Sequence, residues 1–261
     1  CLIDRIEEIA YLNDLCDREG MDTITTGNLC AFAIEAARRG KVNLKIDYGD
    51  VDAIASLVRM IARREGIGDV LAEGIRHAAT AWGLEDIAVH VKGMEPAGYD
   101  PRPLKGMGLA YGSSDRGASH LRATFYKPEL SGMIHPEKIE GKAELFVEFE
   151  SRLTIFDMLV LCRFYRDFYL WDKLGEVIGL VTGLEATERA LKEKALEVAT
   201  LIRRFNIREG MVPQDDRLPK FLHQPLQDNG KVITEAEMEA LLKDYYRLHG
   251  WDPNGVPPNA E

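Results

Sequence analysis

The sequence has little cysteine, no long apolar run and no excess of basic residues, and each shortage excludes a class of protein. Its 261 residues include four cysteines and no CxxC pair. This argues against a disulfide framework or a zinc finger and favours a reducing, cytoplasmic setting. No apolar run approaches the roughly 18 residues of a membrane-spanning helix. The net charge of −10 argues against a nucleic-acid partner, because phosphate binding needs a basic face.

The remaining composition is that of a folded protein, with 46% apolar and 29% charged residues. The length allows one large domain or two modest ones. The chain begins with Cys1 rather than Met, and apolar residues recur at helical spacing from Leu2 onward without a leader-like segment before them. We therefore interpret the chain as a piece of a longer protein that starts within a structured region.

Apolar residues spaced close to 3.6 apart predict an all-α, multihelical fold. Asp50 and Asp69 are predicted N-caps, and Thr234 with Glu237 forms a capping box before the last helix. The expected helices cover about 2–15, 28–39, 51–65, 70–82, 144–152, 156–170, 171–181, 191–205 and 235–248. Residues 85–118 are rich in Gly and Pro and have little helical pattern, which predicts a long loop of the kind that often carries function.

Two six-residue segments resemble each other, Asp17-Arg-Glu-Gly-Met-Asp22 and Asp157-Met-Leu-Val-Leu-Cys162. We call them the first and second hexapeptides. Each places an acid five residues before a second acid or a thiol. At the end of a helix, such a segment can present a carboxylate to the guanidine-like edge of a pterin or guanine, whose two N–H donors match its two oxygens. The alternative is that Asp17 and Asp157 are ordinary helix-end acids and Cys162 is a small buried hydrophobe.

His120 lies between Arg116 and Arg122 in the Gly-rich segment. A histidine on such a loop can donate a proton near neutral pH or donate a hydrogen bond to a metal-bound oxygen. The flanking cations oppose its protonation, which favours a role in the neutral form. A purely structural histidine is the alternative.

Several segments, in order along nearly the whole chain, resemble the aldehyde ferredoxin oxidoreductase family. They are 17–25, 92–102, 106–122, 157–162, 203–210, 216–219 and 250–257. The resemblance implies a tungsten or molybdenum ion held by two pterin dithiolenes beside a 4Fe-4S cluster. In the family, a β-rich N-terminal domain precedes two helical domains and the cofactor lies between the domains. This chain would correspond to the helical domains alone, with the first over 1–135, including the loop 85–118, and the second over 136–261.

The resemblance also implies roles for individual residues. His120 would be catalytic, Cys162 would ligate the iron–sulfur cluster, and the cofactor-binding residues would be Asp17, Met21, Asp22, Arg122, Asp157 and Leu161. The other cluster cysteines and a glutamate near the metal would lie upstream, since Cys1, Cys16 and Cys30 do not have the expected spacing.

Two positions depart from the family pattern, and the mild one is Met21, where the family usually has Leu. Val160 stands where the family's hexapeptide usually has Gly, and a β-branched residue is not expected to adopt a positive φ. A backbone contact to a pterin is therefore not expected there.

The implied reaction is oxidation of an aldehyde to a carboxylic acid, with electrons passing through the cluster to ferredoxin. The alternatives are a reductase of aromatic acyl-CoA thioesters in the same family, and a cofactor-free, non-catalytic helical fragment. Besides ferredoxin, the implied partner is the family's N-terminal β-rich domain, and a homo-oligomer is left open. An acidic ferredoxin needs a local basic patch on a chain of net charge −10, and Arg163 and Arg166 beside Cys162 are the candidates.

Overall fold

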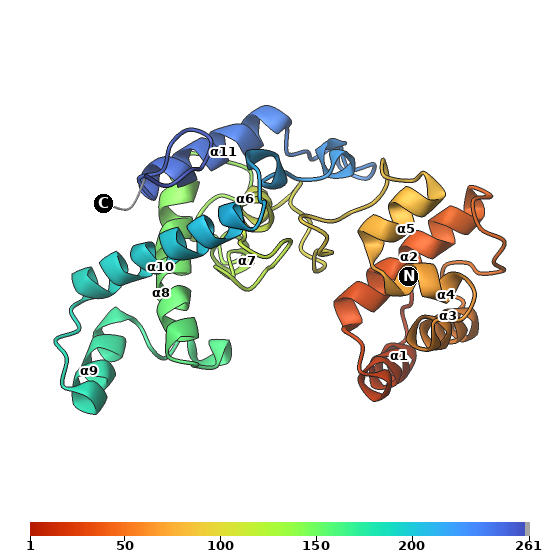
Figure 1. The fold of residues 1–261 in the computed structure, drawn as a ribbon, viewed down its shortest axis with the longest axis horizontal. Coiled ribbons are helices and arrows are strands. Elements are labelled where there is room, and N and C mark those ends of the chain that lie inside the picture. Colours follow the sequence, from red (N-terminus) through yellow and green to blue (C-terminus); the bar gives the residue numbers. More distant parts are fainter. Residues whose placement is uncertain (259–261) are drawn as a thin grey trace. The chain divides into compact units, whose positions relative to one another are not determined.

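The computed structural model describes residues 1–258, and within that range the protein is all-α, as predicted (Figure 1). It has eleven α-helices and three short 3-10 helices over these residues. In place of strands there is one isolated bridge, between Val91 and Met94. No helix in the described part of the chain is long and apolar enough to cross a membrane.

The chain divides into two packed units. Unit 1 contains Cys1–Ala97 and Pro219–Phe221, and unit 2 contains Gly98–Leu218 and the chain from Leu222 onward. The packing therefore divides at residues 97 and 98. The boundary predicted at 135 and 136 concerns the family's domains and stays a prediction.

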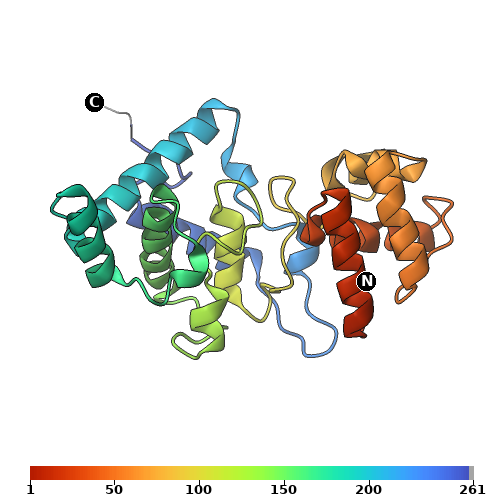
Figure 2. The ribbon, with the colours of Figure 1, turned by 90° about the horizontal axis from the view of Figure 1, so that it is seen from below.

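Unit 1 is a bundle of five helices. Their bounds are α1 Ile6–Glu19, α2 Thr23–Arg38, α3 Val51–Arg63, α4 Ile67–Ala72 and α5 Ile75–Trp82. The helix α3 packs against α1, α2 and α4, and Figure 2 shows α1 in red beside α3 in orange. Asp50 caps α3 as predicted, since its carboxylate accepts from the Ala53 N–H at 3.0 Å.

The single helix predicted over 70–82 with Asp69 as its cap was wrong. The structure has two short helices there, and Asp69 lies inside α4. Gly74 separates them with a φ of 90°, a conformation that a helix cannot continue through.

Unit 2 is built around α8, which packs against α6, α10 and α11 (Figure 1). The helices of unit 2 are α6 Lys105–Ser113, α7 Tyr126–Leu130, α8 Lys142–Met158, η1 Arg163–Tyr165, α9 Trp171–Thr182, α10 Glu188–Arg208, η2 Pro213–Asp215 and α11 Glu235–Leu248. The short η3, Lys220–His223, has residues in both units. The predicted capping box is present at the start of α11. The Glu237 N–H donates to Thr234 Oγ1 at 3.2 Å, and the Thr234 N–H donates back to Glu237 Oε2 at 2.9 Å.

Two predictions in unit 2 were wrong. The Gly-rich segment contains a helix, α6, whose nine residues are all buried. Its glycines admit neighbours at close range, because a Cβ on Gly108 would lie 2.5 Å from Ile233 and one on Gly112 would lie 2.2 Å from Met238. The helix predicted over 156–170 does not form, because α8 ends at Met158 and the second hexapeptide turns the chain away.

Candidate active site

The first hexapeptide is the C-terminal end of α1. Gly20 has a φ of 69°, its N–H donates to the Asp17 carbonyl at 3.2 Å, and the Met21 N–H donates to the Cys16 carbonyl at 2.9 Å. These two bonds and the left-handed residue form a Schellman ending. Asp22 then takes extended backbone, with φ −65° and ψ 127°, and begins α2.

The second hexapeptide repeats this geometry at the end of α8. The Val160 N–H donates to the Asp157 carbonyl at 3.1 Å and the Leu161 N–H donates to the Phe156 carbonyl at 2.9 Å. Cys162 has φ −65° and ψ 126° and begins η1, matching Asp22 within one degree. Two segments that share only their first residue, an Asp, therefore adopt one backbone turn.

The expectation that Val160 avoids a positive φ was wrong, since its φ is 56°. The left-handed region costs an L-residue about 1–2 kcal/mol. The Val160 side chain is 91% exposed, so packing does not compel this conformation. The hydrogen bonds of the helix ending hold it instead. Arg64 has the same φ of 56° at the end of α3, so this is a conformation that helix endings impose on non-glycine residues in this protein.

The two acids of the first hexapeptide accept few hydrogen bonds. The Asp17 carboxylate is exposed and accepts one bond, from Asn13 Nδ2 at 3.2 Å. Asp22 caps α2 by accepting from the Thr25 N–H at 2.8 Å. Neither acid forms an ion pair with a basic side chain among the described residues.

A buried carboxyl, that of Glu95, contacts Thr25, which lies three residues after the first hexapeptide. Glu95 is 4% exposed, and its Oε2 accepts from Thr25 Oγ1 at 3.1 Å, while Oε1 has no hydrogen-bond partner. Burial raises the pKa of Glu95, and the nearby charge of Asp22 raises it further. Glu95 falls within a segment of the family resemblance but was not singled out from the sequence, which gave no sign that Thr25 and Glu95 meet.

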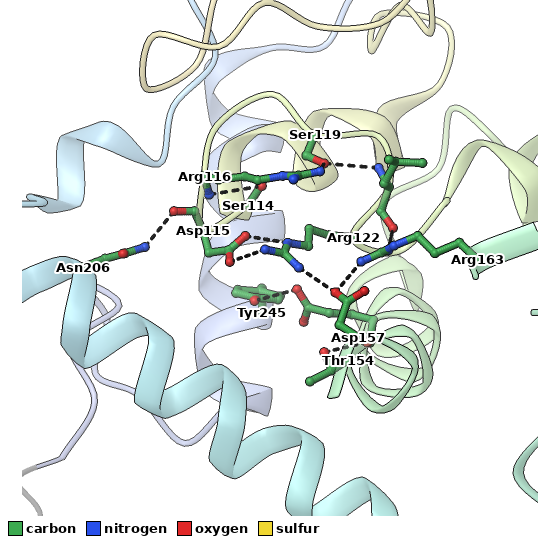
Figure 3. A network of polar contacts seen from close by, with 12 residues as sticks. Ser114, Asp115, Arg116, Ser119, Arg122, Thr154, Asp157, Arg163, Asn206 and Tyr245 are labelled. Atoms are coloured by element: carbon green, nitrogen blue, oxygen red, sulfur yellow. Dashed lines mark hydrogen bonds and ion pairs between the residues drawn. The ribbon is translucent and has the colours of Figure 1, made fainter. Parts of the chain in front are cut away.

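The acid of the second hexapeptide is held by two arginines (Figure 3). Asp157 Oδ2 accepts from Arg122 Nη1 at 2.7 Å and from Arg163 Nη2. Arg122 also forms a bidentate ion pair with Asp115, in which both N···O distances are 2.6 Å. From α10, Asn206 Nδ2 donates to the Asp115 carbonyl at 2.7 Å. Arg122 thus lies between two carboxylates, and its contact with a cofactor stays a prediction.

His120 lies half-buried beside a pair of stacked tyrosines. The Tyr99 and Tyr126 rings are 4.0 Å apart and nearly parallel, and the His120 ring is 5.7 Å from Tyr99. Burial lowers the pKa of His120, and the charges of Arg116 and Arg163 lower it further. The neutral form is favoured, as expected, although the second cation is Arg163 rather than Arg122.

The cysteines fall into two groups. Cys162 is exposed, so the alternative that it is a buried hydrophobe was wrong. Cys16 and Cys30 are buried in the core of unit 1, and burial raises the pKa of Cys30 to about 12, which opposes formation of a thiolate ligand. Within residues 1–258 no three His, Cys, Asp or Glu side chains converge as a metal site. This chain therefore offers a cluster one exposed thiol, that of Cys162.

The basic patch predicted for ferredoxin docking was wrong. The Arg163 side chain is 16% exposed and is paired with Asp157. Arg166 is 7% exposed and donates to the Arg163 carbonyl at 2.8 Å. Both guanidinium groups serve contacts inside unit 2, so neither forms an exposed positive surface.

Known proteins resemble this chain over its whole length. The family described as aldehyde ferredoxin oxidoreductase, domains 2 & 3, matches residues 1–261. The chain belongs to the aldehyde ferredoxin oxidoreductase family. Its relatives in that family are oxidoreductases, and both hexapeptides, His120 and Cys162 lie within the matched region.

The curated relatives are longer than this chain. The tungsten-containing aldehyde ferredoxin oxidoreductases of Pyrococcus furiosus and Thermococcus kodakarensis are 29% and 27% identical to this chain over 99% of its residues. The chain spans 45% of the length of each. An aliphatic sulfonate oxidoreductase, WOR-like subunit, from Pyrococcus furiosus is 30% identical over 96% of this chain and 41% of its own length.

The fold also recurs in a solved structure, the active site complex BamBC of benzoyl coenzyme A reductase with 1,5-dienoyl-CoA. The TM-score is 0.72 at 21% identity, covering 91% of this chain and 42% of the other. The aldehyde ferredoxin oxidoreductase fold is therefore shared by proteins whose names describe different reactions.

Proposed function

We propose that this chain is the helical part of an enzyme that oxidises aldehydes to carboxylic acids on tungsten, or molybdenum, held by two pterins. The observation that carries the proposal is the exposed acid that opens the helix-ending turn of both α1 and α8. The same turn also ends α2, α3, α5, α10 and α11, where no acid stands at that position. An exposed carboxylate beside a left-handed turn fits the N–H-rich edge of a pterin, because the carboxylate accepts two parallel hydrogen bonds.

The residues divide between two pterins and a cluster. Asp17, Met21 and Asp22 would hold one pterin, and Asp157, Leu161 and Arg122 the other. Cys162 would be one thiolate ligand of a 4Fe-4S cluster whose other ligands lie outside this chain. When bound, the metal and its pterins would supply the two-electron chemistry.

The reaction sets a task for His120. An aldehyde and one water give a carboxylic acid, two protons and two electrons. His120 in its neutral form is suited to accept one of those protons near neutral pH. The electrons would leave through the cluster to ferredoxin, and the setting would be the cytoplasm.

A second reaction, reduction of an aromatic acyl thioester, is favoured by one feature. The stacked Tyr99 and Tyr126 beside His120 provide a flat surface on which an aromatic ring can stack, with edge and face geometries that aromatic pairs prefer. The BamBC complex, whose fold this chain shares, is named for benzoyl coenzyme A, which is an aromatic acyl thioester.

The test uses the longer natural protein that contains this chain, purified without oxygen. Metal, iron and pterin content are measured together with aldehyde-dependent reduction of a viologen dye or ferredoxin and with reduction of benzoyl-CoA. We expect tungsten or molybdenum, an iron–sulfur spectrum and aldehyde oxidation. A protein with full metal content that reduces benzoyl-CoA and leaves aldehydes unchanged would replace the first function with the second, and a metal-free protein would contradict both.

Two variants assign the residues. His120→Ala is expected to lower turnover while the metal content stays near that of the wild type, because His120 would act on the substrate rather than hold the metal. Cys162→Ser is expected to lower the iron content. Loss of the metal in the His120 variant would contradict the role given to His120.

A further inference from the structure

Arg163 contacts both the second hexapeptide and the loop that carries His120. Its Nη2 donates to Asp157 Oδ2, and its Nη1 donates to the carbonyl of Leu121, the residue after His120. The Arg163 side chain is 16% exposed, while the Asp157 side chain that it pairs with is 36% exposed and open to a ligand. Figure 3 shows this guanidinium beside that of Arg122, with the Asp157 carboxylate between them.

We infer that Arg163 is a positioning residue that couples the occupancy of the second hexapeptide to the placement and charge of His120. The inference deepens the proposed function, since Asp157 and His120 belong to the proposed site. It concerns contacts among this chain's own residues and can be tested without cofactor or substrate.

The argument begins with the Asp157 carboxylate. One of its oxygens, Oδ2, accepts from both Arg122 and Arg163. Arg122 has a second anion, Asp115, whereas Arg163 has Asp157 as its one ion-pair partner among the described residues. A ligand whose N–H groups draw on Asp157 therefore removes charge compensation mainly from Arg163.

The loss of charge compensation at Arg163 affects His120, because Arg163 also contacts Leu121, the residue after His120. An Arg163 that loses Asp157 keeps its contact with the Leu121 carbonyl, so its guanidinium can move toward the imidazole and strengthen the positive field there. That field is only weakly screened in a half-buried site. The groups that face His120 are Arg116, Arg163, Tyr99 and Tyr126. Ligand binding at Asp157 then shifts His120 further toward its neutral form, which is the form that accepts a proton.

Arg116 provides the matched comparison. It also lies near His120, but its hydrogen bond goes to Ser119 Oγ at 3.0 Å, and no contact joins it to Asp157. Both arginines supply charge to His120. Arg163 alone of the two also touches the second hexapeptide within the described structure.

The experiment is an NMR titration of the His120 ring in the 261-residue chain. Asp157→Asn imitates the loss of the carboxylate charge and is expected to lower the pKa of His120. Arg163→Gln is expected to raise it. In the Arg163→Gln background, Asp157→Asn is expected to have little further effect, whereas in the Arg116→Gln background its effect should persist.

A shift from Asp157→Asn that is equally large with and without Arg163 would overturn the inference, as would no shift in any variant. The rings of His223 and His249 in unit 2 report in the same spectra whether a variant is folded. Should Arg163→Gln unfold unit 2, Arg163→Lys takes its place, because lysine keeps the charge and cannot bridge both partners. There the Asp157→Asn shift is expected to shrink, and an undiminished shift would overturn the inference.

The outcome is separate from that of the proposed function. Failure of the coupling leaves aldehyde oxidation and pterin content of the longer protein unchanged. Failure of the proposed function would show as absent turnover or absent metal, whatever the titration of His120 gives.

Discussion

The two hexapeptides share one backbone turn and differ in what supports their acids. The first belongs to a unit with an apolar core, in which Glu95 is the buried charged residue among those described. The second belongs to a unit with two buried ion pairs among the residues described, Lys142 with Glu129 and Arg203 with Asp216. The helix-end hydrogen bonds thus set the turn in both places, while the surrounding unit decides how firmly the acid is held.

This difference separates two kinds of recognition. Asp17 is exposed and lightly bonded, so it can turn toward a ligand. Asp157 is already engaged by Arg122 and Arg163, so a ligand must share or displace those bonds. Under the proposed function, the first hexapeptide would bind its ligand without involving other charged groups, and the second would pass the effect of binding to His120 through Arg163.

The largest expected effect is on the buried framework of unit 2, at the opposite end of α8 from the second hexapeptide. Lys142 and Glu129 are fully buried and 2.6 Å apart, and Lys142→Met would leave a buried carboxylate without its partner. We expect unit 2 to lose about 3–5 kcal/mol of unfolding free energy. Urea unfolding followed by Trp171 and Trp251 reports on unit 2, and Trp82 reports on unit 1.

The control is Lys138→Met, because Lys138 is exposed. Its expected change is within about 0.5 kcal/mol. An equal loss from both variants, or a loss from Lys142→Met that also moves the Trp82 transition, would break the contrast between the two units.

The next effect tests the shared turn. A Cβ on Gly20 would meet nothing within 4 Å, so Gly20→Val changes the backbone preference alone. We expect it to destabilise unit 1 by about 1–2 kcal/mol, the cost of a left-handed residue. Val160→Gly is expected to stabilise unit 2 by up to about 1 kcal/mol, since the strain removed exceeds the entropy that glycine adds to the unfolded chain.

Thermal or urea unfolding of the two variants measures both changes. A loss of stability in Gly20→Val together with a gain in Val160→Gly would support the view that the two hexapeptides share one turn. A Gly20→Val variant as stable as the wild type would mean that the two turns are not equivalent.

The smallest effect concerns Glu95. Burial raises the pKa of this carboxyl above its ordinary value of 4.5, so the folded state disfavours the ionised form. The contribution of Glu95 to stability is therefore greatest below pH 4.5 and declines as the pH rises from 4.5 through the raised pKa. The wild type should lose stability across that window relative to Glu95→Gln, and parallel pH profiles for the two proteins would contradict this.

Most of the fold could be predicted from the sequence, because long amphipathic helices follow one apolar period. The end of α1 at Gly20, the cap at Asp50 and the box at Thr234 rest on local chemistry and were predicted. The buried helix α6 could not be, since its glycines lower helix propensity and become favourable only through contact with residues such as Ile233 and Met238.

The individual residues of the site could be predicted from the sequence, but the contacts between them could not. The hexapeptides and His120 stand out by residue type and spacing. The pairing of Arg122 and Arg163 with Asp157 joins residues from 35 and 6 positions away, and no local pattern indicates it. The positive φ of Val160 was unpredictable for a similar reason, because it follows from hydrogen bonds at the end of α8 rather than from the preference of valine.

The measurement that tests the central claim most directly is the pterin content of the longer protein with Asp17→Asn, Asp157→Asn and Asp14→Asn. Asp14 is an exposed acid on α1, paired with Arg18 at 2.6 Å and outside the hexapeptide, which makes it the matched control. If both hexapeptides are pterin-binding turns, the first two variants lose pterin and the third keeps the wild-type content. Full pterin content in Asp17→Asn and Asp157→Asn would contradict the account.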